Sequence, residues 1–182
     1  MDIGLIPRRY AKALYAVCEE RSDTATLYRL MQTLAEAFAD VPGLASTVAN
    51  PFVSDADKTD LLTKAVYGDG ETPDTTYEDF LHLLEKNKRT ALIREIALAF
   101  VDLYRRNNAI YRVDICSAAP MGDKERGRLE NIIARHIGKG TFEYSYSVDP
   151  ALIGGFTVTV NSERLDASVS NQLKQLRLKL ID

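Results

Sequence analysis

The sequence of 182 residues predicts an α+β protein, with a six-helix bundle over residues 1–107 and a small α/β domain with a three- to four-stranded sheet over residues 108–182. A change of pattern along the chain predicts this division. Apolar residues recur at helical spacing up to about Asn107, and beyond it they alternate with polar residues in several short segments. The composition, 46% hydrophobic and 27% charged, is typical of a folded protein.

The first part contains six segments with the periodicity of amphipathic helices. Ser22 is expected to cap the second helix and Ser54 the fourth, because a serine hydroxyl can accept a hydrogen bond from a free amide of the first turn. Asn50-Pro51 ends the third helix, since a residue before proline is driven out of the helical region. The sixth segment, 92–104, is the most regular. Short connections between these helices predict a bundle.

The second part begins with an alternating segment from Ala109, which predicts a half-buried strand. A helix follows and ends before Gly138, where glycine provides a stop. Two further alternating segments, 142–148 and 156–160, predict strands, and the tail from Ser168 has helical spacing. A small sheet with two helices is therefore expected.

Composition excludes several classes of function. Lys and Arg total 23 against 26 Asp and Glu, and a net charge of −3 argues against a dedicated nucleic-acid-binding protein. Cys18 and Cys116 form no CxxC motif, and His82 and His136 cannot supply a histidine-rich metal site alone. Every long apolar stretch is interrupted by charges, so no segment is expected to span a bilayer.

No catalytic constellation is found in the sequence. It has no GxSxG nucleophile motif, and Gly138-Lys139-Gly140 lacks the spacing of a phosphate-binding loop. The basic clusters 86–89 and 105–106 lie near predicted helix ends, where cations complement the helix dipole. We therefore expect a binding protein with no catalytic residues, no cofactor and no metal.

Six segments carry a family resemblance, and they occur in the family's order from residue 9 to residue 176. They are Arg9-Tyr10-Ala11-Lys12-Ala13-Leu14, Asn50-Pro51, Phe80-Leu81-His82-Leu83-Leu84-Glu85-Lys86-Asn87-Lys88-Arg89, Ser117-Ala118-Ala119-Pro120, Asp149-Pro150-Ala151-Leu152-Ile153-Gly154-Gly155-Phe156, and 166–176. Together they resemble the delta-subunit family of F-type ATP synthases, whose mitochondrial counterpart is the oligomycin-sensitivity-conferring protein. Ala167 and Asn161 depart from it, because glycine is common at those positions.

The resemblance implies a non-catalytic stator component of the peripheral stalk. Its N-terminal domain, 1–107, would bind the N-terminal helices of the alpha subunits, and 108–182 would bind the C-terminal helices of the b subunits. The catalytic head, which contains the alpha subunits, would then be kept from turning with the rotor while proton flow drives ATP synthesis. The expected location is the cytoplasmic face of a bacterial cell membrane, reached only through the complex. An RNA-binding helical-bundle regulatory domain is the alternative, and the acidic balance argues against it.

Candidate binding residues follow from this assignment as a hypothesis. For the alpha subunit they are Tyr10, Ala13, Leu14, Val17, Phe80 and Leu81, although the same apolar stripes must also build the bundle core. For the b subunit they are Leu173, Leu176 and Leu180.

A further set of motif residues is expected to be mainly structural. They are Arg9, Asn50, Pro51, Asn87, Arg89, Asp149, Pro150, Gly154 and Gly155. The segment 149–156 is expected to set the turn and register of the sheet, with direct contact to b as the alternative.

Overall fold

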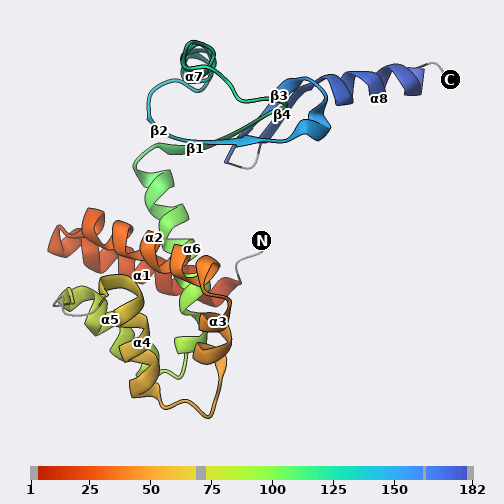
Figure 1. Cartoon of the computed structure of the whole chain (residues 1–182). Coiled ribbons are helices and arrows are strands. Elements are labelled where there is room, and N and C mark those ends of the chain that lie inside the picture. The colour runs from red at the N-terminus through yellow and green to blue at the C-terminus, as the bar shows by residue number, and fades with distance from the viewer. Residues whose placement is uncertain (1–3, 69–72, 162, 180–182) are drawn as a thin grey trace. The chain divides into compact units, whose positions relative to one another are not determined.

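The computed structural model describes residues 4–68, 73–161 and 163–179, and the chain divides into two compact units between Tyr104 and Arg105 (Figure 1). The division falls inside helix α6, Ile93–Asn107, whose last residue is the predicted domain boundary. Each unit has its own hydrophobic core, so each is described by itself.

The first unit is helical, as its periodicity predicted. Its α-helices among the described residues are α1 (Leu5–Arg21), α2 (Thr24–Asp40), α3 (Pro42–Ala49), α4 (Asp55–Tyr67), α5 (Thr75–Lys86) and α6. The expected count of six needs a correction, because the short 3-10 helix η1, Thr90–Leu92, precedes α6, and α6 itself continues past the division. The chain bends ahead of η1, where Lys88 has a φ of 52°.

One predicted helix cap is confirmed and one is wrong. The hydroxyl of Ser54 accepts a hydrogen bond from the amide of Asp57 at 3.1 Å, as expected for a cap of α4. Ser22 instead ends α1 with a φ of 58°, a left-handed conformation in which its own amide donates to the carbonyl of Glu19 at 3.3 Å. Ser22 is thus the C-terminal cap of α1. The position before the first residue of α2 is Asp23, so Ser22 lies one residue too early to cap α2.

The bundle core combines aliphatic and tyrosine side chains. Phe100, Leu27 and Met31 have no exposed surface. Tyr77 is equally buried, and its hydroxyl donates to the carbonyl oxygen of Leu62 at 3.2 Å, which satisfies a polar group inside the core. The rings of Tyr28 and Tyr104 stack with their centroids 4.1 Å apart. Helix α6 thus contributes both to the core and to its aromatic edge.

The second unit is a mixed four-stranded sheet with helices, so the open choice between three and four strands is resolved as four among the described residues. Its strand order is β2-β1-β3-β4; β1 and β2 are parallel, and the other pairs are antiparallel. In chain order the elements are β1 (Ile110–Ser117), α7 (Asp123–Ile137), β2 (Thr141–Val148), the 3-10 helix η2 (Pro150–Leu152), β3 (Gly155–Val160), β4 (Glu163–Ser168) and α8 (Val169–Lys179).

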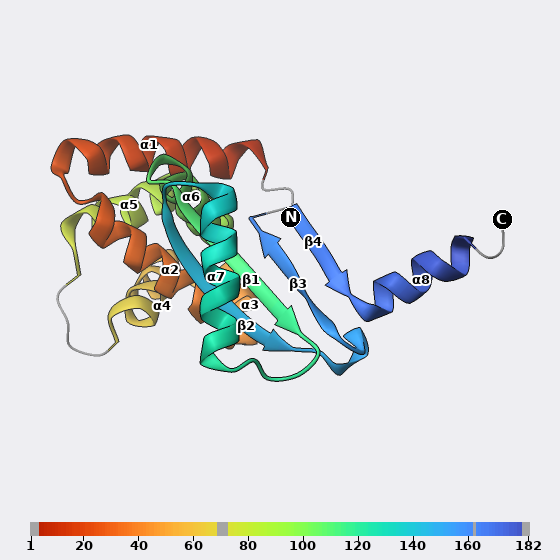
Figure 2. The ribbon, with the colours of Figure 1, turned by 90° about the horizontal axis from the view of Figure 1, so that it is seen from above.

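Helix α7 covers one face of this sheet over β1 and β2, and leaves the β3–β4 side of that face open (Figure 2). The register brings Val113 opposite both Tyr144 and Val160, so apolar residues share the face beneath α7. Leu129 and Ile133 of α7 complete this core. Arg112 and Asp114 alternate with the buried positions of β1 and lie on the opposite, polar face.

Candidate functional site

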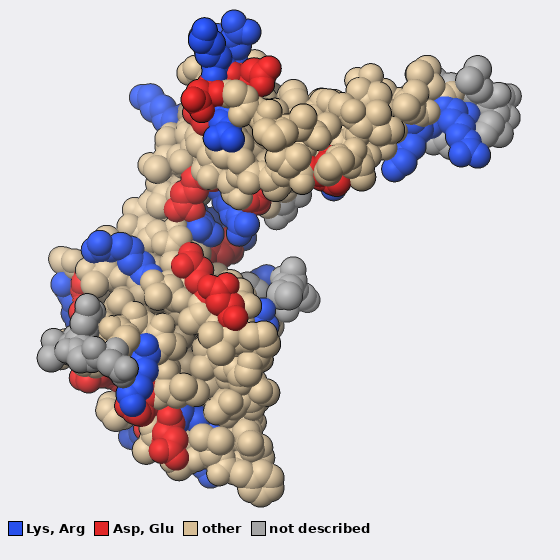
Figure 3. Space-filling view, viewed as in Figure 1, with Lys and Arg blue, Asp and Glu red and all other residues tan. Residues whose placement is uncertain are grey.

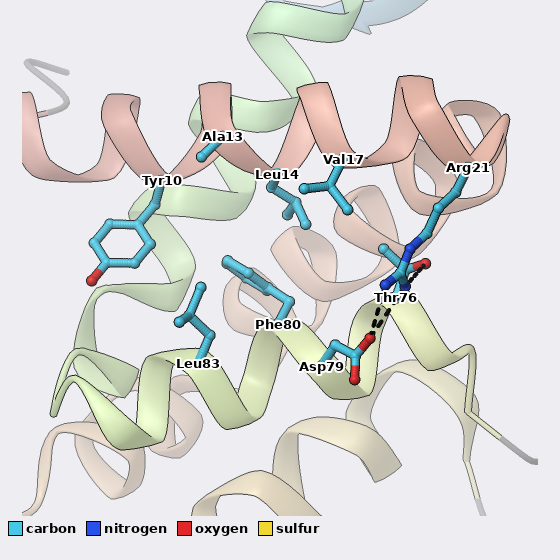
Figure 4. Close-up of a pocket in the computed structure, with 9 residues that line it drawn as sticks. All are labelled: Tyr10, Ala13, Leu14, Val17, Arg21, Thr76, Asp79, Phe80 and Leu83. Atoms are coloured by element: carbon cyan, nitrogen blue, oxygen red, sulfur yellow. Dashed lines mark hydrogen bonds and ion pairs between the residues drawn. The ribbon is translucent and has the colours of Figure 1, made fainter.

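Helices α1 and α5 enclose an apolar groove of about 150 Å³ on the first unit (Figure 4). Helix α1 contributes Tyr10, Ala13, Leu14, Val17 and Arg21, and helix α5 contributes Thr76, Asp79, Phe80 and Leu83. Both sets have helical spacing, so each wall is a single face of its helix. The groove therefore forms only where two segments distant in sequence pack together.

The groove has a buried floor and an exposed rim. Leu14 and Phe80 retain only 6% and 4% of their surface, because they also belong to the bundle core. Val17 on one wall is 40% exposed, and Leu83 on the other is 47% exposed. Val17 and Leu83 thus leave an apolar rim in contact with water, and the hydrophobic effect would favour its burial.

One end of the groove is polar. Arg21 donates from Nη1 to Thr76 Oγ1 at 3.1 Å and to Asp79 Oδ2 at 3.2 Å, which joins the end of α1 to the start of α5 (Figure 4). The side chains of Arg21 and Asp79 are 46% and 66% exposed, so this ion pair contributes less than about 1 kcal/mol to stability. The pair bounds the apolar surface of the groove at this end.

Most of the residues predicted to bind the alpha subunit lie on this groove. Tyr10, Ala13, Leu14, Val17 and Phe80 all line it. Leu81 does not, because it is 1% exposed and points into the bundle core. Leu83 lines the groove in its stead. It lies three residues after Phe80, and this helical spacing could have identified it from the sequence. The binding role of these residues stays a prediction.

Helix α8 of the second unit presents to solvent two of the three residues predicted to bind the b subunit. Leu173 is 51% exposed and Leu176 is 56% exposed, and one helical turn separates them. Leu180 lies outside the described residues. The two leucines thus form an apolar strip on a helix that packs against β4 and η2.

The segment 149–156 builds the connection from β2 to β3. Asp149 accepts a hydrogen bond from the amide of Ala151 at 2.9 Å, which caps η2 at Pro150. Gly155 has a φ of +73°, and a Cβ there would lie 2.3 Å from the carbonyl oxygen of Ala167. A Cβ at Gly154 would lie 2.9 Å from Val169 Cγ2. Gly155 is therefore required by its φ and by the close backbone, whereas a side chain at Gly154 would only force the Val169 methyl to shift, and together these contacts support a structural role for this motif.

Ile153 in this segment was not singled out by sequence. It has a φ of 66° although it is β-branched, and it is 66% exposed. No periodicity predicts such a conformation, which lies at the end of η2, where the amide of Ile153 donates to the carbonyl oxygen of Pro150 at 3.0 Å.

The other motif residues mostly serve chain turns. The side chain of Asn50 accepts from the amide of Phe52 at 2.9 Å, so the Asn-Pro turn is closed by its own asparagine. Asn87 ends α5 and donates from Nδ2 to the carbonyl oxygen of Leu83 at 2.9 Å. The amide of Arg89 donates to the carbonyl oxygen of Leu84 at 2.8 Å. Arg9 and Pro51 are exposed.

Neither departure from the family pattern distorts the sheet. Asn161 adopts a φ of 53° at the end of β3, a left-handed conformation that asparagine tolerates better than most residues. Ala167 of β4 pairs with Phe156 of β3 in the regular antiparallel register.

The described residues include no cluster of His, Cys, Asp or Glu able to hold a metal ion. None of the helices within 4–68, 73–161 and 163–179 combines the length and apolar character needed to cross a membrane.

Comparison with known proteins identifies the family. The family model "ATP synthase delta (OSCP) subunit" matches residues 6–180. "ATP synthase subunit delta" of Bacteroides fragilis is 36% identical over 182 residues, covering 100% of this chain and 97% of that protein. The protein of the same name from Parabacteroides distasonis is 35% identical, with 100% and 99% covered.

A solved structure shares the fold. A chain in the cryo-EM structure of the Toxoplasma gondii mitochondrial ATP synthase hexamer superposes with a TM-score of 0.76 at 20% identity, covering 98% of this chain and 99% of that one. ATP synthesis and ion transport are processes of the whole complex, in which proteins of this kind are structural subunits of the peripheral stalk. The chain described here therefore belongs to the ATP synthase delta (OSCP) subunit family.

Proposed function

We propose that this protein joins the N-terminal helices of the alpha subunits to the C-terminal helices of the b subunits, and so keeps the catalytic head from turning with the rotor. The apolar groove between α1 and α5 carries the proposal. Its membrane association would be peripheral, through the b subunits. The role requires affinity and stiffness and no reactive group.

An amphipathic helix of the alpha subunit would lay its apolar side chains on Leu14 and Phe80, between the rims formed by Val17 and Leu83. Burying these exposed rims supplies the favourable free energy, and the Arg21–Asp79 pair would meet a polar part of the incoming helix. A nanomolar joint needs about −12 kcal/mol, which a central apolar cluster provides better than surface charges do.

The decisive experiment is a calorimetric titration of the full chain with a synthetic peptide of roughly the first twenty residues of the cognate alpha subunit. One-to-one binding at micromolar affinity or tighter is expected. Ala13→Asp, on the groove wall, should weaken binding at least about tenfold, because a charge would be buried without a partner. Ala16→Asp is the matched control, since Ala16 is exposed on the same helix outside the groove.

Either of two results would contradict this half of the proposal. One is a folded protein, verified by circular dichroism, that does not bind the peptide. The other is equal affinity in the Ala13 and Ala16 variants.

The second joint would be helix α8, through Leu173 and Leu176. Leu173→Asp with Leu176→Asp should abolish binding of a fragment from the C-terminal end of the b subunit, measured by the same titration. Ile132→Asp is the control, because Ile132 is a 62% exposed apolar residue on α7 of the same unit. Retained b binding in the α8 variant would place the second joint elsewhere.

A further inference from the structure

Residues 172–177 of helix α8 carry a one-sided pattern of charge beside the exposed leucines. Leu173 and Leu176 are each followed by a basic residue, Lys174 and Arg177, and each is preceded by a glutamine. Successive residues are rotated by about 100° around a helix, so within residues 172–177 the two cations lie on one flank of the leucine strip and the two neutral amides on the other. Lys179, the last residue of α8, follows one turn beyond Leu176 and lies outside this stretch. Both cations are exposed.

No acid balances this flank within the helix, because the sequence from Val169 to Lys179 contains neither Asp nor Glu. Figure 3 shows Lys and Arg side chains gathered near the C-terminal end of α8. Asp166 lies before the helix, and its carboxylate is engaged by the amide and hydroxyl of Ser168 at 3.0 and 2.6 Å. The charge of Asp166 also acts on Lys174, but α8 itself contains no acid, so this flank keeps an excess of positive charge for a partner.

We infer that α8 selects a helix whose apolar strip is bordered on one side by acidic side chains. The inference rests on the proposed function, in which α8 receives the b subunit, and adds the charge pattern that this partner must present. Two helices pack with their apolar strips together, and charges bordering the strip then choose partner and orientation. Complementary border charges raise the association rate and are weakened by salt.

A partner helix fits this surface better than an anionic membrane does. Helices that lie in a membrane interface combine a basic face with large apolar anchors such as Trp and Phe. The stretch from Val169 to Lys179 has no aromatic residue. Two half-exposed leucines match the contact of one or two turns of a second helix.

The test uses the full chain and two synthetic helical peptides with the same leucine strip. One peptide has glutamates along one flank, and the other has lysines there. The wild type is expected to bind the acidic peptide at least about tenfold more tightly than the basic one in low salt, with the preference shrinking as ionic strength approaches about 0.5 M. Lys174→Glu with Arg177→Glu should reverse the preference.

Arg128→Glu with Arg135→Glu is the matched control, because both arginines are on α7, away from the leucine strip of α8. It should leave the preference unchanged. If the charge-reversed α8 variant unfolds by circular dichroism, Lys174→Gln with Arg177→Gln replaces it, and should remove the preference.

The outcomes separate the two claims. If a cognate b fragment binds and the leucine variant abolishes this binding, but the two peptides bind equally, the charge inference fails and the proposed function stands. If neither the b fragment nor the peptides bind a folded protein, both fail. Binding to anionic lipid vesicles that Lys174→Glu with Arg177→Glu abolishes, without any peptide preference, would also overturn the inference, since the basic flank would then serve a membrane.

Discussion

The backbone amide of Val169 donates a hydrogen bond to the carbonyl oxygen of Gly154 at 3.0 Å. Val169 is the first residue of α8, and Gly154 lies in the turn between β2 and β3. The Val169 side chain also occupies the space that a Cβ on Gly154 would enter. The family motif at 149–156 thus fixes the start of the helix to which we assign the b subunit.

Gly155→Ala should destabilise the second unit by more than about 1 kcal/mol. Gly155 has a φ of +73°, and the new Cβ would meet the backbone of Ala167, which cannot rotate away. Gly127→Ala in α7 is the control, because nothing lies within 4 Å of a Cβ there and alanine favours helix. Thermal unfolding followed by circular dichroism compares the two. A melting temperature of the Gly155 variant equal to that of wild type would refute the tight approach.

Tyr77→Phe should lower the free energy of unfolding of the first unit by about 1 kcal/mol. The change removes a buried hydrogen bond to the carbonyl oxygen of Leu62 and leaves that oxygen without this donor. Urea unfolding measured by helical circular dichroism checks this value. Tyr10→Phe, at a half-buried tyrosine of the groove, should change stability by only a few tenths of a kcal/mol. Equal effects of the two substitutions would argue against the buried bond.

The two cysteines should differ in reactivity. Cys18 has no exposed surface, and burial raises the pKa of its thiol to about 11, so little thiolate exists at pH 8. Cys116 in β1 is half-buried. A maleimide or disulfide reagent should modify Cys116 at least about tenfold faster in the native protein. Cys18→Ser and Cys116→Ser variants assign the two rates, and similar rates would contradict the burial of Cys18.

The start of α8 should loosen in acid. Hydrogen bonds from the Ser168 hydroxyl and amide lower the pKa of Asp166. Its contribution to stability is therefore complete above the unfolded pKa, about 3.9, and is lost as pH falls through the lower folded pKa. Asp166→Ala should speed amide hydrogen exchange at Ser168 near neutral pH, and the difference from wild type should shrink below the folded pKa. Asp123→Ala on α7 should leave this amide unchanged. A pH-independent difference would mean that the charge of Asp166 is irrelevant.

The spacing of apolar residues correctly predicted which residues share one face of a helix. The apolar stripe of α1 led to Tyr10, Ala13 and Val17, which lie together in the groove. On α5 the strongest stripe, with Tyr77 and Leu81, turned out to face the core. The groove uses the neighbouring face of that helix, and a single sequence cannot tell which face of a helix meets which neighbour.

Backbone conformations were harder to predict than faces. Ser22 looks like a helix cap by type, yet it takes a left-handed conformation that closes α1. Ile153 takes a positive φ in the turn between η2 and β3. Such positions follow from the geometry of flanking elements, and residue preferences alone do not contain that geometry.

The groove walls come from segments whose bridging residues, Arg21 and Thr76, are 55 positions apart. An unfolded chain therefore has no groove, and an occupant binds only the native bundle. Occupancy and folding are then thermodynamically linked, with a gain of about 2.7 kcal/mol when the free occupant is at a hundred times its Kd. Inside an assembled complex, where the tethered partner is always near, the bundle would be held more firmly folded than it is alone.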